Sequence, residues 1–169
     1  MNLLIAGQNA RGALGIMSAC VISAAAQVAP APTGDTPALA QFYVLDGTRP
    51  EEPEAGQWQR VFDAFPQSGK RTEPNQTAEV ISELTAEVER RGADTSGTPI
   101  FVLVFNLGRF RDLRKSEDDY SFGFDKDKPT SVNKQFSDLL RNGPAVGIHT
   151  IIWCDTYNNV NRWLSREVI

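Results

Sequence analysis

The chain has 169 residues and a formal net charge of -4, with 17 Lys and Arg against 21 Asp and Glu. Apolar residues make up 41% and charged residues 22% of it, which excludes a disordered or fibrous protein and fits one globular domain. The acidic balance gives no overall attraction to nucleic acid, and the lack of a purely apolar stretch of about 20 residues argues against direct membrane insertion.

Short apolar strands alternate with helices along the whole sequence. The predicted strands are residues 3–6, 41–45, 99–105 and 148–154. The predicted helices are residues 14–28, 57–65, 77–91, 131–142 and 157–168, the first of them buried on most sides, and residues 116–130 are expected to form an exposed loop. This alternation is typical of βαβ units and predicts an α/β fold, with a mostly parallel sheet and helices on both faces.

The first predicted loop has the sequence GQNARGAL, and Gly7 and Gly12 within it have the G-x-x-x-x-G spacing of a phosphate-binding loop. In such a loop, backbone N–H groups and the amino end of the next helix hold the phosphates. The lysine and the serine or threonine that should follow are Ala13 and Leu14. The segment is therefore either a nucleotide site that has lost its chemistry or a turn in which glycines permit positive φ.

Ligands of parallel sheets bind beyond the carboxyl ends of the strands. Besides the first loop, the polar residues predicted to lie there are Asp46, Asn106 and Asp155. The two aspartates are equally compatible with ordinary caps at strand ends. His149 is the only histidine, so the sequence predicts neither a clustered metal site nor a catalytic residue.

Cys20 and Cys154 lie in apolar runs without metal-ligand spacing, which predicts two buried, reduced thiols and a cytoplasmic protein. Arg11 and the apolar residues after it also have the pattern of a signal peptide. The predicted strand before Arg11 favours a strand, loop and helix instead.

Five segments taken together resemble the motor domain of FtsK/SpoIIIE-type DNA translocases. NLLIAGQNARGALGIMSACVISAAAQ is similar to the Walker A strand, loop and helix, QFYVLDG to the next strand, ELTAEVERR to a helix with a Glu-Arg-Arg ending, PIFVLVFNLGRFRDL to the Walker B strand, and LLRNGPAVGIHTIIWCDT to the glycine-rich turn and sensor strand. The segments follow the family's order over nearly the whole chain. The resemblance implies a RecA-like P-loop NTPase domain over residues 1–169, as part of a larger multidomain protein.

The chain departs from the family at the residues that carry the chemistry. The resemblance assigns nucleotide binding to Gly7, Gln8, Asn9, Ala10, Arg11, Gly12, Ala13 and Leu14. The Walker B Asp-Glu pair falls on Asn106 and Leu107, the sensor on Cys154 and Asp155, and the arginine of the preceding turn on Pro144. Because the positive charge, the metal ligands and the base are lost together, hydrolysis is expected to be near background.

The resemblance therefore implies a degenerate ATP-binding module that serves ring assembly or regulation. ATP is its candidate cofactor, while the Mg²⁺ ligands are missing. The expected partners are other ATPase modules of the same protein or ring, with DNA reached through the assembled motor. Two alternatives remain open: an active ATPase whose rearranged site uses Arg11, Asp46 or Asp155, and an interaction domain that binds no nucleotide.

A basic run near the Walker B segment has two interpretations. Arg109, Arg111, Arg114 and Lys115 are interleaved with Phe110. The run is either a solvated charged face or a contact surface for nucleic acid.

Overall fold

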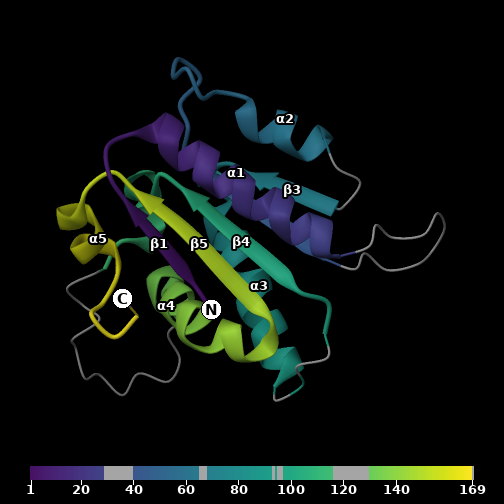
Figure 1. Cartoon of the computed structure of the whole chain (residues 1–169). Coiled ribbons are helices and arrows are strands. Elements are labelled where there is room, and N and C mark those ends of the chain that lie inside the picture. Colours follow the sequence, from purple (N-terminus) through teal and green to yellow (C-terminus); the bar gives the residue numbers. More distant parts are fainter. Residues whose placement is uncertain (29–39, 65–67, 93, 95–96, 116–129, 169) are drawn as a thin grey trace.

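The computed structural model describes residues 1–28, 40–64, 68–92, 94, 97–115 and 130–168. Its strands form one sheet of five, in the order β1-β5-β4-β2-β3, and every neighbouring pair is parallel (Figure 1). The strands are β1 Leu3–Ala6, β2 Gln41–Asp46, β3 Ser68–Thr72, β4 Ile100–Phe105 and β5 Ile148–Cys154. Because all five run the same way, their carboxyl ends meet at one edge of the sheet, as the sequence predicts.

Helices cover both faces of this sheet, which confirms the predicted layers (Figure 1). The helices are α1 Ala10–Gln27, α2 Gln57–Asp63, α3 Thr77–Arg91, α4 Val132–Asn142 and α5 Tyr157–Trp163. Successive residues of β2 point to opposite faces, so Phe42 packs with α1 and α2 while Tyr43 packs with α3 and α4. The strands are apolar throughout because both of their faces are covered.

Helix α1 differs from its prediction in two ways. It begins at Ala10, because the Asn9 side chain accepts the N–H of Gly12 and so caps the helix before the expected start at Leu14. It is also not buried on most sides. The buried residues repeat every fourth position, as Ala13, Met17, Val21 and Ala25, and therefore form a single stripe against the sheet.

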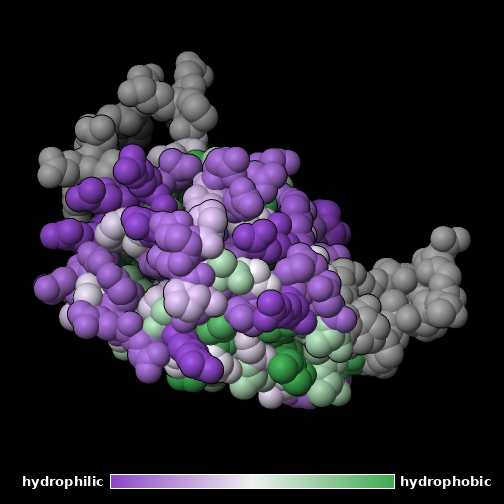
Figure 2. Space-filling model, turned by 90° about the horizontal axis from the view of Figure 1, so that it is seen from above, coloured by the Kyte–Doolittle hydropathy of each residue, from purple (hydrophilic) through white to green (hydrophobic). Residues whose placement is uncertain are grey.

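The outer side of α1 is apolar and open to solvent, with Ile16 50% and Ile22 54% exposed. Figure 2 shows a mainly hydrophilic face with hydrophobic residues gathered along one rim. By length and composition α1 could cross a membrane, and it lies near the amino terminus with 22% of its residues buried. Its buried stripe on the sheet is that of a helix in a layered α/β domain.

Strand β3 was not predicted from the sequence. Its residues, SGKRT, are polar, because β3 lies at the edge of the sheet and pairs only with β2. A Cβ on Gly69 would lie 2.5 Å from the Phe62 ring, so the glycine allows α2 to pack against this strand. Helices α2 and α5 end at Asp63 and Trp163, earlier than predicted. The predicted loop at residues 116–130 falls outside the described residues, apart from Thr130.

Arg91 connects the end of α3 to two other segments. Its Nε donates to Glu87 Oε1 at 2.7 Å, its Nη1 to the Val146 carbonyl at 2.8 Å and its Nη2 to the Thr98 carbonyl at 2.8 Å. The side chain is only 4% exposed. A Cβ on Gly97 would lie 2.9 Å from the guanidinium carbon, so the chain before β4 needs a glycine to pass this group.

We expect Arg91→Ala to lower the free energy of unfolding by about 3 kcal/mol, because it leaves two carbonyl groups without a donor. Arg90→Ala is the matched control, since Arg90 contacts the same Glu87 but lies on the surface. Urea unfolding of both variants measures the difference. A similar loss in both would contradict the role assigned to Arg91.

The Glu87 carboxylate makes the stability of the fold depend on pH. Hydrogen bonds from Arg90 and, to a lesser degree, Arg91 lower its pKa from 4.5 to about 2, against the opposing effect of burial. A pKa that is lower in the folded protein stabilises the fold above pH 4.5, and this stabilisation is lost as the pH falls towards 2. Unfolding measured from pH 6 to pH 2 should therefore depend less steeply on pH in Glu87→Gln than in the wild type.

Candidate functional site

The sheet has three positions at which neighbouring strands send the chain to opposite faces. From their carboxyl ends, β1 and β2 lead to α1 and α2 on one face, whereas β3, β4 and β5 lead to helices on the other. The chain therefore diverges between β1 and β5, between β4 and β2, and between β2 and β3. Ligands of open α/β sheets bind in crevices of this kind.

The predicted phosphate loop lies at the first position. The Gly7 N–H donates to the Cys154 carbonyl at 3.0 Å, and Trp153 Nε1 donates to the Gly7 carbonyl at 2.9 Å, so the loop is fixed to the end of β5. Only Gly7, Gln8 and Asn9 lie outside regular structure, because α1 already begins at Ala10.

Two features of this loop differ from a phosphate cradle. The Gly12 N–H already has an acceptor, Asn9 Oδ1, at 2.9 Å. Gly12 also lies inside the first helical turn and does not have positive φ, so that explanation for the second glycine is wrong. Ala13 is 3% exposed and faces the sheet, whereas Arg11 and Leu14 line a separate cavity of about 510 Å³ beside Glu54.

The predicted strand-end residues of β4 and β5 lie where the sequence placed them. Asn106 follows β4 in the left-handed region, with φ 66° and ψ 66°, and Leu107 is fully buried in the apolar core. Asp155 follows β5, and its Oδ1 accepts from Asn159 Nδ2 at 2.7 Å in the first turn of α5. One oxygen of the Asp155 carboxylate thus holds the start of α5 to the end of β5.

The Cys154 thiol at the end of β5 is not a reactive group. Burial raises the pKa of Cys154 to about 11, so this thiol stays protonated at neutral pH. Cys154 is buried as predicted, but Cys20 is partly exposed, because α1 covers the sheet with only one stripe. Within the described ranges, no three His, Cys, Asp or Glu side chains are grouped closely enough to hold a metal ion.

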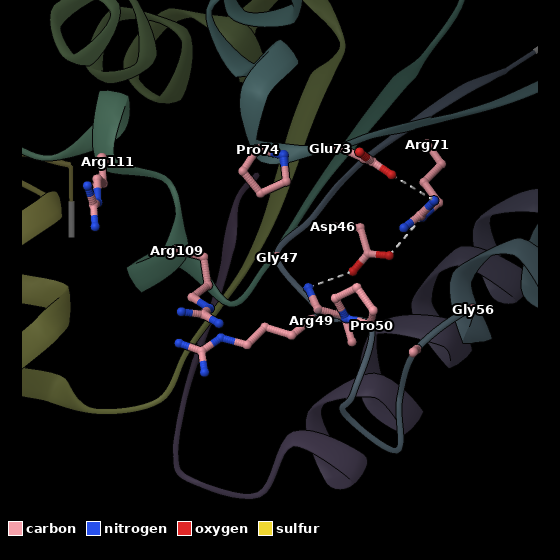
Figure 3. A pocket seen from close by; sticks show the side chains of 12 residues that line it. Asp46, Gly47, Arg49, Pro50, Gly56, Arg71, Glu73, Pro74, Arg109 and Arg111 are labelled. Carbon is pink, nitrogen blue, oxygen red and sulfur yellow. Dashed lines mark hydrogen bonds and ion pairs between the residues drawn. The ribbon is translucent and has the colours of Figure 1, made fainter.

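A larger cavity, of about 770 Å³, lies at the other two positions, around the end of β2 (Figure 3). Its charged lining residues are Asp46, Arg49, Arg71, Glu73, Arg109 and Arg111. Asp46 is 1% exposed, with Oδ2 accepting from Arg71 Nε at 2.8 Å and Oδ1 from the Thr48 N–H at 3.0 Å. Asp46 therefore fixes the wall of the cavity through bonds within the protein.

Gly47 allows the chain after β2 to pack closely against the chain after β4. A Cβ at this position would lie 2.7 Å from the Phe105 carbonyl oxygen, 3.0 Å from that of Asn106 and 3.1 Å from Arg109 Cβ. The Gly47 N–H also donates to the Phe105 carbonyl at 2.9 Å. The glycine and the left-handed turn at Asn106 together place Arg109 at the cavity.

These arginines come from three separate parts of the sequence and were not predicted to lie together. Arg49 lies in the connection after β2, Arg71 in the unpredicted strand β3, and Arg109 and Arg111 after β4. Arg109 and Arg111 appeared only as part of a basic run. One sequence signal could have indicated the cavity: DGTR follows a predicted strand and so places a basic residue near the carboxyl ends of the strands, where ligands bind.

Comparison with known proteins gives one informative likeness. No protein-family model matches the chain, and no curated protein matches it. A solved structure described as "ATPase" is similar, with a TM-score of 0.58 and 17% sequence identity over 96% of this chain and 58% of that chain. The chain has an ATPase-like α/β fold. It thus spans 58% of the length of that ATPase chain, and the likeness confirms the predicted RecA-like fold class.

We expect Gly47→Ala to lower the free energy of unfolding by about 2 kcal/mol, because the added methyl group meets two backbone oxygens that cannot move independently. Gly15→Ala is the matched control: a Cβ there meets no atom within 4 Å, and alanine favours the helix by about 0.5–1 kcal/mol. Urea unfolding should shift in opposite directions for the two variants. Equal shifts would contradict the close contact at Gly47.

Proposed function

We propose that this chain is an ATPase-fold module of an FtsK/SpoIIIE-type translocase that does not hydrolyse ATP and serves assembly or regulation of the ring. Its partners would be other ATPase modules, with DNA engaged through the assembled motor. The observation that carries this proposal is the burial of two residues at catalytic positions. Ala13, at the lysine position, is 3% exposed, and Leu107, at the base position, is fully buried.

The residues at the loop do not fit Mg²⁺-ATP. The loop supplies no lysine and no Ser or Thr at the position that holds the metal, and Asn9 already occupies the Gly12 N–H. The first-turn N–H groups of Ala10 and Arg11 and the exposed Arg11 side chain remain for an anion. Nucleotide bound there would therefore be held weakly and without a metal.

The contacts of Asp46 disfavour an active ATPase whose rearranged site uses this residue. Asp46 is 1% exposed, and both of its oxygens accept bonds within the protein, from Arg71 and from the Thr48 N–H. It would first have to give up a partner to act as base or metal ligand.

The free thiols of Cys20 and Cys154 support a cytoplasmic location. A reducing compartment keeps such thiols free, and the proposed ATP-driven assembly also works in the cytoplasm. Detection of the native protein in a secreted fraction would contradict this location.

A titration with fluorescent ATP, with and without Mg²⁺, tests the proposed function together with a phosphate-release assay. We expect no phosphate release above background and binding that does not depend on Mg²⁺. Asn9→Asp is the informative variant, because it keeps the helix cap and adds a negative charge that repels phosphate, so it should weaken nucleotide binding. Mg²⁺-dependent turnover would contradict the proposal, and a complete lack of binding would favour the interaction domain.

A further inference from the structure

The cavity around the end of β2 contains more positive charge than its own carboxylates can balance. Four arginines line it, against Asp46 and Glu73. Both carboxylates are paired with the same residue: Arg71 Nε lies 2.8 Å from Asp46 and Arg71 Nη1 lies 3.8 Å from Glu73. The remaining arginines therefore have no acidic partner within the cavity.

Arg49 and Arg109 are the most available of these arginines. The side chain of Arg49 has one long contact, 3.9 Å, to the exposed Glu51. The Arg109 side chain makes no hydrogen bond or ion pair with any residue that the structure describes, and the Arg109 N–H donates to the Asn106 carbonyl at 3.0 Å. In Figure 3 the guanidinium groups of Arg49 and Arg109 extend towards the same part of the cavity, while Arg71 turns to Asp46.

The backbone holds these like charges in place. Arg109 is positioned by the contact of its Cβ region with Gly47 and by the left-handed conformation of Asn106, which costs free energy in a residue other than glycine. Two guanidinium groups whose one acidic neighbour among the described residues is the exposed Glu51, at 3.9 Å from Arg49, repel each other, and an anion between them removes that repulsion. The net charge of the whole chain is -4, so this concentration of arginine is local.

We propose that this cavity binds the phosphoryl groups of a small phosphorylated ligand that carries at least two negative charges. Guanidinium groups match phosphate oxygens bidentately, and a dianion balances the two arginines in excess over the carboxylates. The volume of about 770 Å³ is that of a small-molecule site, and Pro50, Ala55 and Pro74 give the non-phosphate part an apolar wall. This site is separate from the loop at residues 7–14 and does not depend on the proposed function.

Calorimetric titration of the whole chain with sodium pyrophosphate, without Mg²⁺, tests the proposal. We expect the wild type to bind and Arg49→Gln/Arg109→Gln to bind at least about tenfold more weakly, because two charged donors are lost. Arg60→Gln/Arg162→Gln is the matched control: it removes the same charge from two exposed residues outside the cavity and should bind like the wild type. Thermal unfolding confirms that each variant is folded.

Four results of the calorimetric titrations would overturn the proposal. The first is no binding of pyrophosphate at millimolar concentration, and the second is an equal loss in the control variant, which would show a general charge effect. Full binding in the Arg49→Gln/Arg109→Gln variant would place the anion elsewhere, such as the amino end of α1. Succinate that binds as tightly as pyrophosphate would rule out phosphoryl selectivity.

A further titration separates a small ligand from a nucleic-acid backbone. An oligonucleotide without a terminal phosphate should compete poorly with pyrophosphate for the wild-type chain. If it displaces pyrophosphate at lower phosphate concentration, the arginines bind a nucleic-acid backbone and the small-ligand proposal is wrong. Asn9→Asp and Arg49→Gln/Arg109→Gln also distinguish the two sites. If only Asn9→Asp weakens nucleotide binding, the nucleotide binds at the loop of residues 7–14 and not in the arginine cavity.

Discussion

The arrangement of residues at the carboxyl ends of the strands depends on the parallel pairing of β4 with β2. In that register Asp46 lies opposite Phe105, so the next residues, Gly47 and Asn106, meet where both strands end. A shift of one residue would put a side chain against the Phe105 and Asn106 carbonyl groups and would also turn the buried residues of β2 to the wrong faces. The hydrogen-bond register thus sets the position of Arg109.

The sheet brings two crevices of different chemistry to the same edge. Near β1 and β5, the lysine position of a P-loop enzyme is taken by the buried Ala13, and the Asn9 cap already occupies the Gly12 N–H. Around β2, by contrast, arginines from strand β3 and from the connections after β2 and β4 line one cavity beside a fully paired Asp46. The proposed phosphoryl site is therefore separate from the loop after β1.

Most of the fold could be predicted because its strands are buried on both faces and read as continuous apolar runs. The amphipathic helix at residues 77–91 was predicted with both of its ends, since Gly92 and two arginines mark the last turn. Strand β3 was not predicted, because it is an edge strand and its sequence, SGKRT, has no apolar pattern. The start of α1 was predicted at Leu14 and not at Ala10, because a single side chain, that of Asn9, caps the helix. The arginine cavity needs the spatial order of the strands, in which β4 lies between β5 and β2, and the sequence does not contain that order directly.

The two outermost strands of the sheet, β3 and β1, differ in chemistry. Strand β3 is polar, and its two charged residues are paired within the fold, Lys70 with Glu83 of α3 and Arg71 with Asp46 of β2. Strand β1 is LLIA, with Leu3 42% exposed, and carries no charge. A strand that came from elsewhere in a longer polypeptide, or from another subunit, would therefore lie beside a polar strand at β3 and beside an uncharged, apolar strand at β1.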